Sequence, residues 1–126
     1  MVLYVLYSFT GIDHVLLAAP KGSENEARHF YNGILGMEEI PKPENLAKRG
    51  GVWFKCGVHQ LHIGIQENFI PAKKAHPAFH VENLEALRDR LIDNEIKVKV
   101  DEPLKGAKRF YVDDPFGNRL EFLQWI

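Results

Sequence analysis

Cysteine is nearly absent from this chain, which carries only Cys56 among its 126 residues. A single thiol cannot form an internal disulfide, so we expect a buried thiol in an apolar strand and a fold that needs no oxidising compartment. A charge excess is also missing, because 17 acidic residues nearly cancel 16 basic ones and leave a net charge of -1. This balance attracts neither nucleic acid nor a membrane surface, so we expect neither as a partner.

Long apolar runs are missing as well. The opening residues 1–10, MVLYVLYSFT, are apolar but too few to cross a membrane. No positive charge precedes them, as one would in a signal peptide. We interpret this segment as an N-terminal extension, either an extra edge strand or an ordered tail, and we expect a cytoplasmic protein.

What the chain does contain is enough apolar sequence for one packed domain, at 45% of its residues. In residues 11–67, Ser23 and Glu26 have the spacing of a capping box at a helix start, and Gly36 suits the left-handed position at its end. The helix carries one apolar stripe. The pattern predicts a strand, this helix and three further strands, at 11–19, 37–40, 52–56 and 60–66.

Residues 75–126 repeat this order of elements. Asn83 is expected to cap a second helix, and Asn94 to take the left-handed position that ends it. Strands are predicted at 75–81, 96–100, 109–112 and 119–125. We therefore predict a duplicated domain over residues 11–126, with module one at 11–67 and module two at 75–126.

Four potential metal ligands occupy equivalent positions of the two modules. His76 follows His14 by 62 positions, and Glu121 follows His62 by 59. If the modules pack about a pseudo-twofold axis, all four side chains converge on one point. Imidazole and carboxylate groups suit Fe, Mn, Ni, Co or Zn, and this set leaves coordination positions open for a substrate. Taken singly, each histidine is better explained as a hydrogen-bonded residue of the core or surface.

Several segments resemble the vicinal oxygen chelate superfamily, which unites glyoxalases, bleomycin-resistance proteins and ring-cleaving dioxygenases. The most specific is the closing hairpin YVDDPFGNRLEF at residues 111–122. Other matching segments are Ile12–Val15, Phe30–Tyr31, Leu35–Met37 and Ala75–Val81. The resemblance covers about residues 11–126.

This resemblance implies an α+β fold in which two tandem βαβββ modules form a half-open mixed β-sheet barrel around a divalent metal ion. His14, His76 and Glu121 match the commonest ligand positions, and Glu121 matches a residue that also moves a proton in glyoxalase I-like enzymes. His62 stands where glyoxalase I enzymes usually carry a glutamate, so the ligand set here has one negative charge fewer. No residues are assignable to glutathione binding.

The pocket for a small-molecule substrate is expected next to these ligands. His80 has the same strand parity as His76 and is expected to face the same cavity. Trp53, Phe54 and Tyr111 are candidates for its apolar wall, although ordinary core packing explains these three residues better.

The resemblance is compatible with three alternative functions. The first is a metal-dependent lyase or isomerase of the glyoxalase type, in which the metal polarises vicinal oxygens of the substrate or intermediate. The second is an Fe(II) ring-cleaving dioxygenase, and the third is a metal-independent drug- or metabolite-binding protein of the bleomycin-resistance type. A homodimer is also implied. Each site would then be built either within one chain or from module one of one chain and module two of the other.

Overall fold

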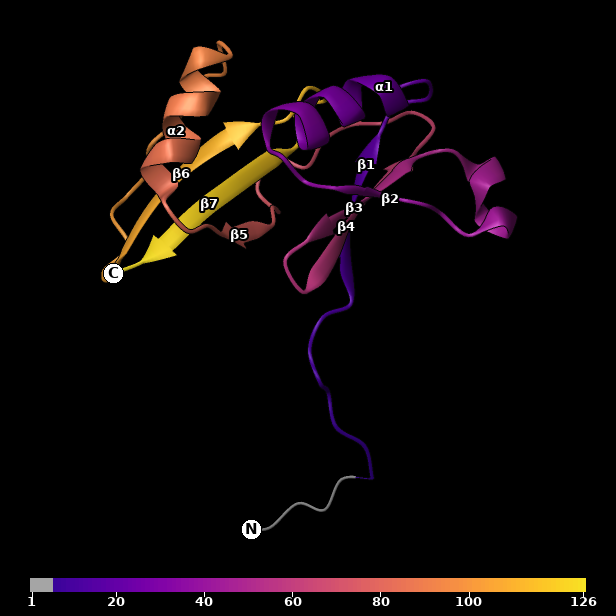
Figure 1. Cartoon of the computed structure of the whole chain (residues 1–126), viewed down its shortest axis with the longest axis horizontal. Coiled ribbons are helices and arrows are strands. Elements are labelled where there is room, and N and C mark those ends of the chain that lie inside the picture. The colour runs from indigo at the N-terminus through magenta and orange to yellow at the C-terminus, as the bar shows by residue number, and fades with distance from the viewer. Residues whose placement is uncertain (1–5) are drawn as a thin grey trace.

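Two mixed β-sheets form the frame of the protein, and each is built by one half of the chain (Figure 1). The computed structural model describes residues 6–126. The first sheet has the order β1-β4-β3-β2, with β1 at His14–Ala19, β2 at Glu39–Ile40, β3 at Val52–Cys56 and β4 at His59–Ile65. The second has the order β5-β7-β6, with β5 at Ala78–His80, β6 at Ala107–Asp113 and β7 at Arg119–Trp125. The α+β class is confirmed, and the two sheets stay open in the part of the chain described.

The two sheets share one topology. In each half, the first strand runs parallel to the last one: β1 pairs with β4, and β5 pairs with β7. In each half, the last strand also pairs antiparallel with the strand before it. The predicted repetition of elements is therefore visible as a repetition of strand pairing, which places the last strand of each half in the middle of its sheet.

The strand predicted at residues 96–100 is wrong. The backbone there pairs only at an isolated bridge between Lys99 and Tyr111. Ile96 and Val98 still pack against the core. The alternation of apolar residues therefore reflects their burial and not strand pairing. The predicted strand at 75–81 also shrinks to β5, because Pro77 has no N–H to donate.

The helices follow their predicted positions but not every predicted end. The first is split into α1, Glu24–Ala27, and a π-helical segment η1, Arg28–Ile34, while α2 spans Leu84–Asp93 and a 3-10 helix η2, Glu44–Arg49, lies inside a predicted loop. Gly36 has the expected positive φ of 77°. Asn83 caps α2 as predicted, since its side chain accepts a hydrogen bond from the Ala86 N–H at 3.3 Å.

Two predicted features of the helix ends are wrong, although Ser23 and Asn94 still flank the helices as expected. Ser23 makes no side-chain cap, because its hydroxyl is buried without a partner among the described residues. The neighbouring Glu24 carboxylate instead accepts a hydrogen bond from the Gly51 N–H at 3.1 Å and so ties the helix start to the first sheet. At the end of α2, Glu95 rather than Asn94 takes the left-handed position, with a φ of 61°.

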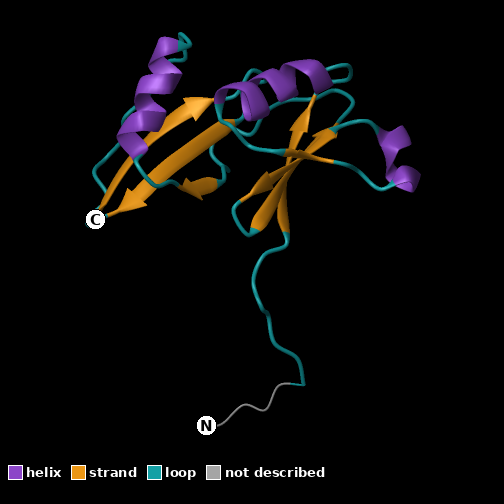
Figure 2. Ribbon diagram, in the orientation of Figure 1, coloured by secondary structure: helices purple, strands orange, loops and turns teal. Residues whose placement is uncertain are grey.

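The described part of the N-terminal extension, residues 6–10, runs away from the domain (Figure 2). Residues 6–10 form no strand, so the edge-strand interpretation fails there, and residues 1–5 lie outside the described part. Leu6 and Phe9 are almost fully exposed. Cys56 is half-buried in β3, and burial raises the pKa of its thiol. No helix among residues 6–126 is long and apolar enough to cross a bilayer.

One apolar core joins the two halves, with α1 and η1 lying beside the start of β7 (Figure 1). The Tyr31 hydroxyl on η1 donates a 2.6 Å hydrogen bond to Asp114, in the turn before β7. Asn118 in the same turn donates one to the Ala18 carbonyl at 2.8 Å. All three side chains are buried, so this network fixes how the first sheet lies against the second.

Candidate metal centre

The first sheet carries a stack of three aromatic rings on the face opposite the core. His62 on β4 lies parallel to Trp53 on β3, with ring centroids 3.9 Å apart. His14 on β1 stacks near His62, with centroids 4.0 Å apart. The register explains this, because Trp53 and His62 are direct partners across β3 and β4. We call Trp53, His62 and His14 the aromatic half-site.

Burial and the neighbouring His14 lower the pKa of His62. An imidazole binds metal only in its neutral form, so this environment keeps His62 ready to act as a ligand. The Gln60 side-chain oxygen lies 2.8 Å from Nε2 and orients the ring. His14 is more exposed, and its Nδ1 lies 2.9 Å from an Asp13 carboxylate oxygen.

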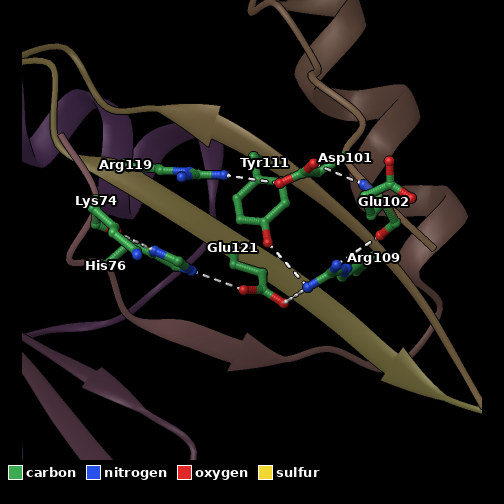
Figure 3. Close-up of polar contacts among 8 residues, drawn as sticks. All are labelled: Lys74, His76, Asp101, Glu102, Arg109, Tyr111, Arg119 and Glu121. Atoms are coloured by element: carbon green, nitrogen blue, oxygen red, sulfur yellow. Dashed lines mark hydrogen bonds and ion pairs between the residues drawn. The ribbon is translucent and has the colours of Figure 1, made fainter. Parts of the chain in front are cut away.

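The second sheet carries the other two predicted ligands in a set of polar contacts (Figure 3). Nε2 of His76 lies 2.9 Å from a Glu121 carboxylate oxygen. Arg109 on β6 reaches the other oxygen of Glu121 at 3.5 Å and donates to the Tyr111 hydroxyl at 3.1 Å. We call His76, Glu121, Arg109 and Tyr111 the ionic half-site.

Glu121 remains a carboxylate despite its burial. Desolvation raises its pKa, but hydrogen bonds with His76, Tyr111 and Arg109, together with the charge of Arg109, outweigh burial and lower it overall. The opposite holds for Tyr111, whose pKa is raised by burial and by the negative charge of Glu121. Glu121 is therefore anionic and Tyr111 is a neutral hydrogen-bond donor at neutral pH.

The His76 ring has an arrangement that fits a cation. Its Nδ1 lies 2.7 Å from the Lys74 carbonyl oxygen, and its Nε2 faces Glu121. A carbonyl and a carboxylate can only accept, so each contact needs a proton on the ring nitrogen that faces it. A metal ion held by Nε2 and the carboxylate would replace the proton between them, and the Lys74 contact would then keep the remaining proton on Nδ1.

The four predicted ligands lie in two pairs, His14 with His62 and His76 with Glu121. Within residues 6–126 of one chain, no group of three or more His, Cys, Asp or Glu side chains is close enough to hold a metal ion. A pair of ligands is too few for a structural or catalytic site of this kind. Each pair is therefore half of the predicted set.

The three predicted pocket residues have different surroundings. Tyr111 belongs to the ionic half-site and lines a neighbouring cavity. His80 accepts a 2.9 Å hydrogen bond from the Trp125 indole and lines a different cavity, near Cys56. Phe54 has no exposed surface and packs beside Tyr31 in the core, because its strand parity is opposite to that of Trp53.

Two residues of the half-sites were not predicted from the sequence. Arg109 was predicted only as the first residue of a strand, and core packing was the preferred role for Trp53. The signal for both was strand register. Arg109 stands two residues before Tyr111 on the same face of β6, and Tyr111 pairs with Glu121.

The sequence matches a protein-family model described as the Glyoxalase/Bleomycin resistance protein/Dioxygenase superfamily over residues 11–122. The chain belongs to this superfamily. No curated protein matches it. Its structure is similar to a crystal structure from Bacillus anthracis, described as a glyoxalase family protein, at 53% identity and a TM-score of 0.94. That match covers 97% of this chain and 100% of the other.

Two less similar crystal structures share the fold. Lactoylglutathione lyase from Agrobacterium tumefaciens is 23% identical with a TM-score of 0.73, and the match covers 94% of this chain and 96% of that one. The fosfomycin resistance protein FosX from Listeria monocytogenes is 17% identical with a TM-score of 0.75, covering 94% of each chain. Both likenesses concern the fold alone.

Proposed function

We propose that this glyoxalase-family chain is a metal-dependent enzyme that acts on a small molecule by lyase or isomerase chemistry. The observation that carries the proposal is the pair of half-sites, whose ligands stand at equivalent positions of two sheets with one topology. His62 is held neutral and Glu121 is held anionic, which are the forms that bind Fe, Mn, Ni, Co or Zn. When bound, the metal supplies Lewis acidity toward two neighbouring oxygens of the substrate.

The residues of the chain have separate parts in this reaction. His14, His62, His76 and Glu121 hold the ion. Tyr111, a neutral donor beside Glu121, orients a substrate oxygen. Glu121 is also the candidate to move a proton, because it is the anionic side chain of the ionic half-site.

We further propose that a second copy of the chain completes each site. Within the described residues 6–126, the two half-sites do not form one ligand group in a single chain. A twofold dimer brings module one of one copy to module two of the other twice over. In that arrangement, His14 and His62 of one copy meet His76 and Glu121 of its partner.

The test is metal content, measured by mass spectrometry after reloading with a mixture of divalent ions. We expect roughly one ion per chain in the wild type, and none in folded His14→Ala, His76→Ala or Glu121→Ala. His29→Ala removes an exposed histidine outside both half-sites and serves as the matched control. No stoichiometric metal in the wild type would refute the proposal.

A mixing experiment tests the shared site. One variant loses module one's ligands (His14→Ala with His62→Ala), and the other loses those of module two (His76→Ala with Glu121→Ala). If sites are shared between copies, random re-association of the two leaves one intact site in each mixed dimer, or about one ion for every four chains. If each site forms within one chain, the mixture binds no metal.

Arg109 favours a second candidate function, that of a metal-independent binding protein of the bleomycin-resistance type. Its guanidinium lies 3.5 Å from Glu121 and already balances the carboxylate charge. Tight binding of an unchanged ligand to the metal-free protein would support this second candidate.

A further inference from the structure

Beside the ionic half-site lies a cavity of about 500 Å³, which opens on the same face of the second sheet. Its walls come from three segments distant in sequence: the linker before β5, the stretch that bridges to β6, and the β6–β7 hairpin. Tyr111 is the wall that the cavity shares with the half-site.

Positive charge outweighs negative charge on these walls. Three cations, Lys73, Lys99 and Arg119, face two anions, Asp101 and Asp113. Lys99 and Asp113 neutralise each other in a 2.6 Å ion pair. Within residues 6–126, Lys73 makes no ion pair or side-chain hydrogen bond, so its charge is available.

Arg119 is held in place with most of its donors unused. Its guanidinium carbon lies 4.2 Å from the centre of the Tyr111 ring, a cation–π contact that fixes its orientation. Its one polar contact in the described chain is a long one, 3.4 Å to Asp101. A guanidinium offers five donors in a planar fork that matches the oxygens of carboxylate and phosphate groups.

The other walls of the cavity are apolar. Ile70 and Val100 are each 79% exposed, so their side chains are available to a ligand. Pro71 packs against the hairpin at Gly117. A Cβ at position 117 would lie 3.1 Å from the proline ring, and φ there is 90°. Glycine at this position keeps the linker close to the hairpin and so keeps Lys73 near Arg119.

From this arrangement we infer an oxyanion-binding subsite in this cavity, in which Arg119 and Lys73 hold a carboxylate or phosphate group. Tyr111 pairs with Glu121 across β6 and β7, so a group bound at Arg119 lies one side chain away from the metal ligand. The substrate is then a small organic anion, with its charge at Arg119, its apolar part against Ile70 and Val100, and its neighbouring oxygens toward Glu121. The substrate assignment rests on the proposed function, whereas the subsite itself does not.

The test follows backbone amide signals by NMR while inorganic phosphate or acetate is added at constant ionic strength, with and without metal in the protein. We expect saturable shifts at residues lining the cavity in both forms. Arg119→Gln should weaken binding about tenfold, the scale of one charge-assisted hydrogen bond, and Lys73→Gln about threefold. Arg88→Gln and Lys55→Gln remove the same charges from exposed positions elsewhere and should leave binding unchanged.

Each outcome of this titration supports or overturns the anion subsite. Tighter binding of phosphate or of acetate supports the subsite and selects the anion class. Absence of saturable shifts in the wild type, or equal weakening by Arg119→Gln and its control Arg88→Gln, overturns it. Anion binding to a protein that never takes up metal would leave the subsite standing and refute the enzyme proposal, so the two failures are distinguishable.

Discussion

The aromatic and ionic half-sites occupy equivalent places in two sheets of one topology, yet different forces hold them. In the aromatic half-site, His62 is fixed by ring stacking on Trp53 and by exclusion from water. In the ionic half-site, Glu121 is fixed by hydrogen bonds and by the charge of Arg109. A repeated backbone therefore repeats the positions of the proposed ligands without repeating the interactions that hold them.

The largest expected difference between the half-sites is in the stability of the metal-free protein. Glu121→Ala leaves the partly buried Arg109 and His76 without their acceptor, so we expect a loss of about 2 kcal/mol. His14→Ala removes a more exposed side chain and should cost about 0.5 kcal/mol or less. Urea unfolding of the metal-free variants measures both. Equal losses would contradict the contrast.

A second difference between the half-sites is the positive charge of Arg109 beside Glu121. Its positive charge beside Glu121 opposes a divalent ion, and the aromatic half-site has no matching cation in its stack. We expect Arg109→Gln to tighten metal binding about tenfold, as measured by competition with a chelating dye. Weaker binding in this variant would mean that Arg109 positions Glu121 more than it repels the ion. Lys108→Gln, on the same strand, is the control.

A third difference between the half-sites is the ring of Trp53, on which His62 stacks. Trp53→Leu removes the ring that His62 stacks on, and we expect it to destabilise the protein by about 1 kcal/mol and to weaken metal binding severalfold. Trp53→Phe should restore part of both losses. Thermal unfolding and metal titration measure them. A full loss in the phenylalanine variant would point to the indole itself rather than to stacking.

The smallest expected effect concerns pH. Because the folded state lowers the pKa of His62, the unfolded chain binds this proton more readily. The stabilising contribution of neutral His62 is present above its unfolded pKa of about 6.5 and is lost as pH falls through the lower folded value. His62→Gln should flatten this part of the stability profile of the metal-free protein, and an unchanged slope would contradict it.

The sequence was sufficient for the family, the α+β class and most of the strands and helices, because apolar periodicity and turn residues are local signals. It failed where tertiary contacts decide. Ser23 lost its cap because Glu24 binds Gly51 across the fold. Phe54 remained a candidate for the pocket wall because strand parity, which separates it from Trp53, follows from the β3–β4 register rather than from hydrophobicity. The separation of the ligands into two pairs depends on how whole sheets pack, which no local pattern encodes.

The buried contact between Tyr31 and Asp114 joins residues 83 positions apart. Severing the peptide chain at the exposed Lys73 would leave this contact, the Asn118 contact with Ala18 and the common core in place. Each sheet would keep all of its own strands, since none pairs across the linker. We therefore expect the two fragments to associate and fold together without a covalent bond between them.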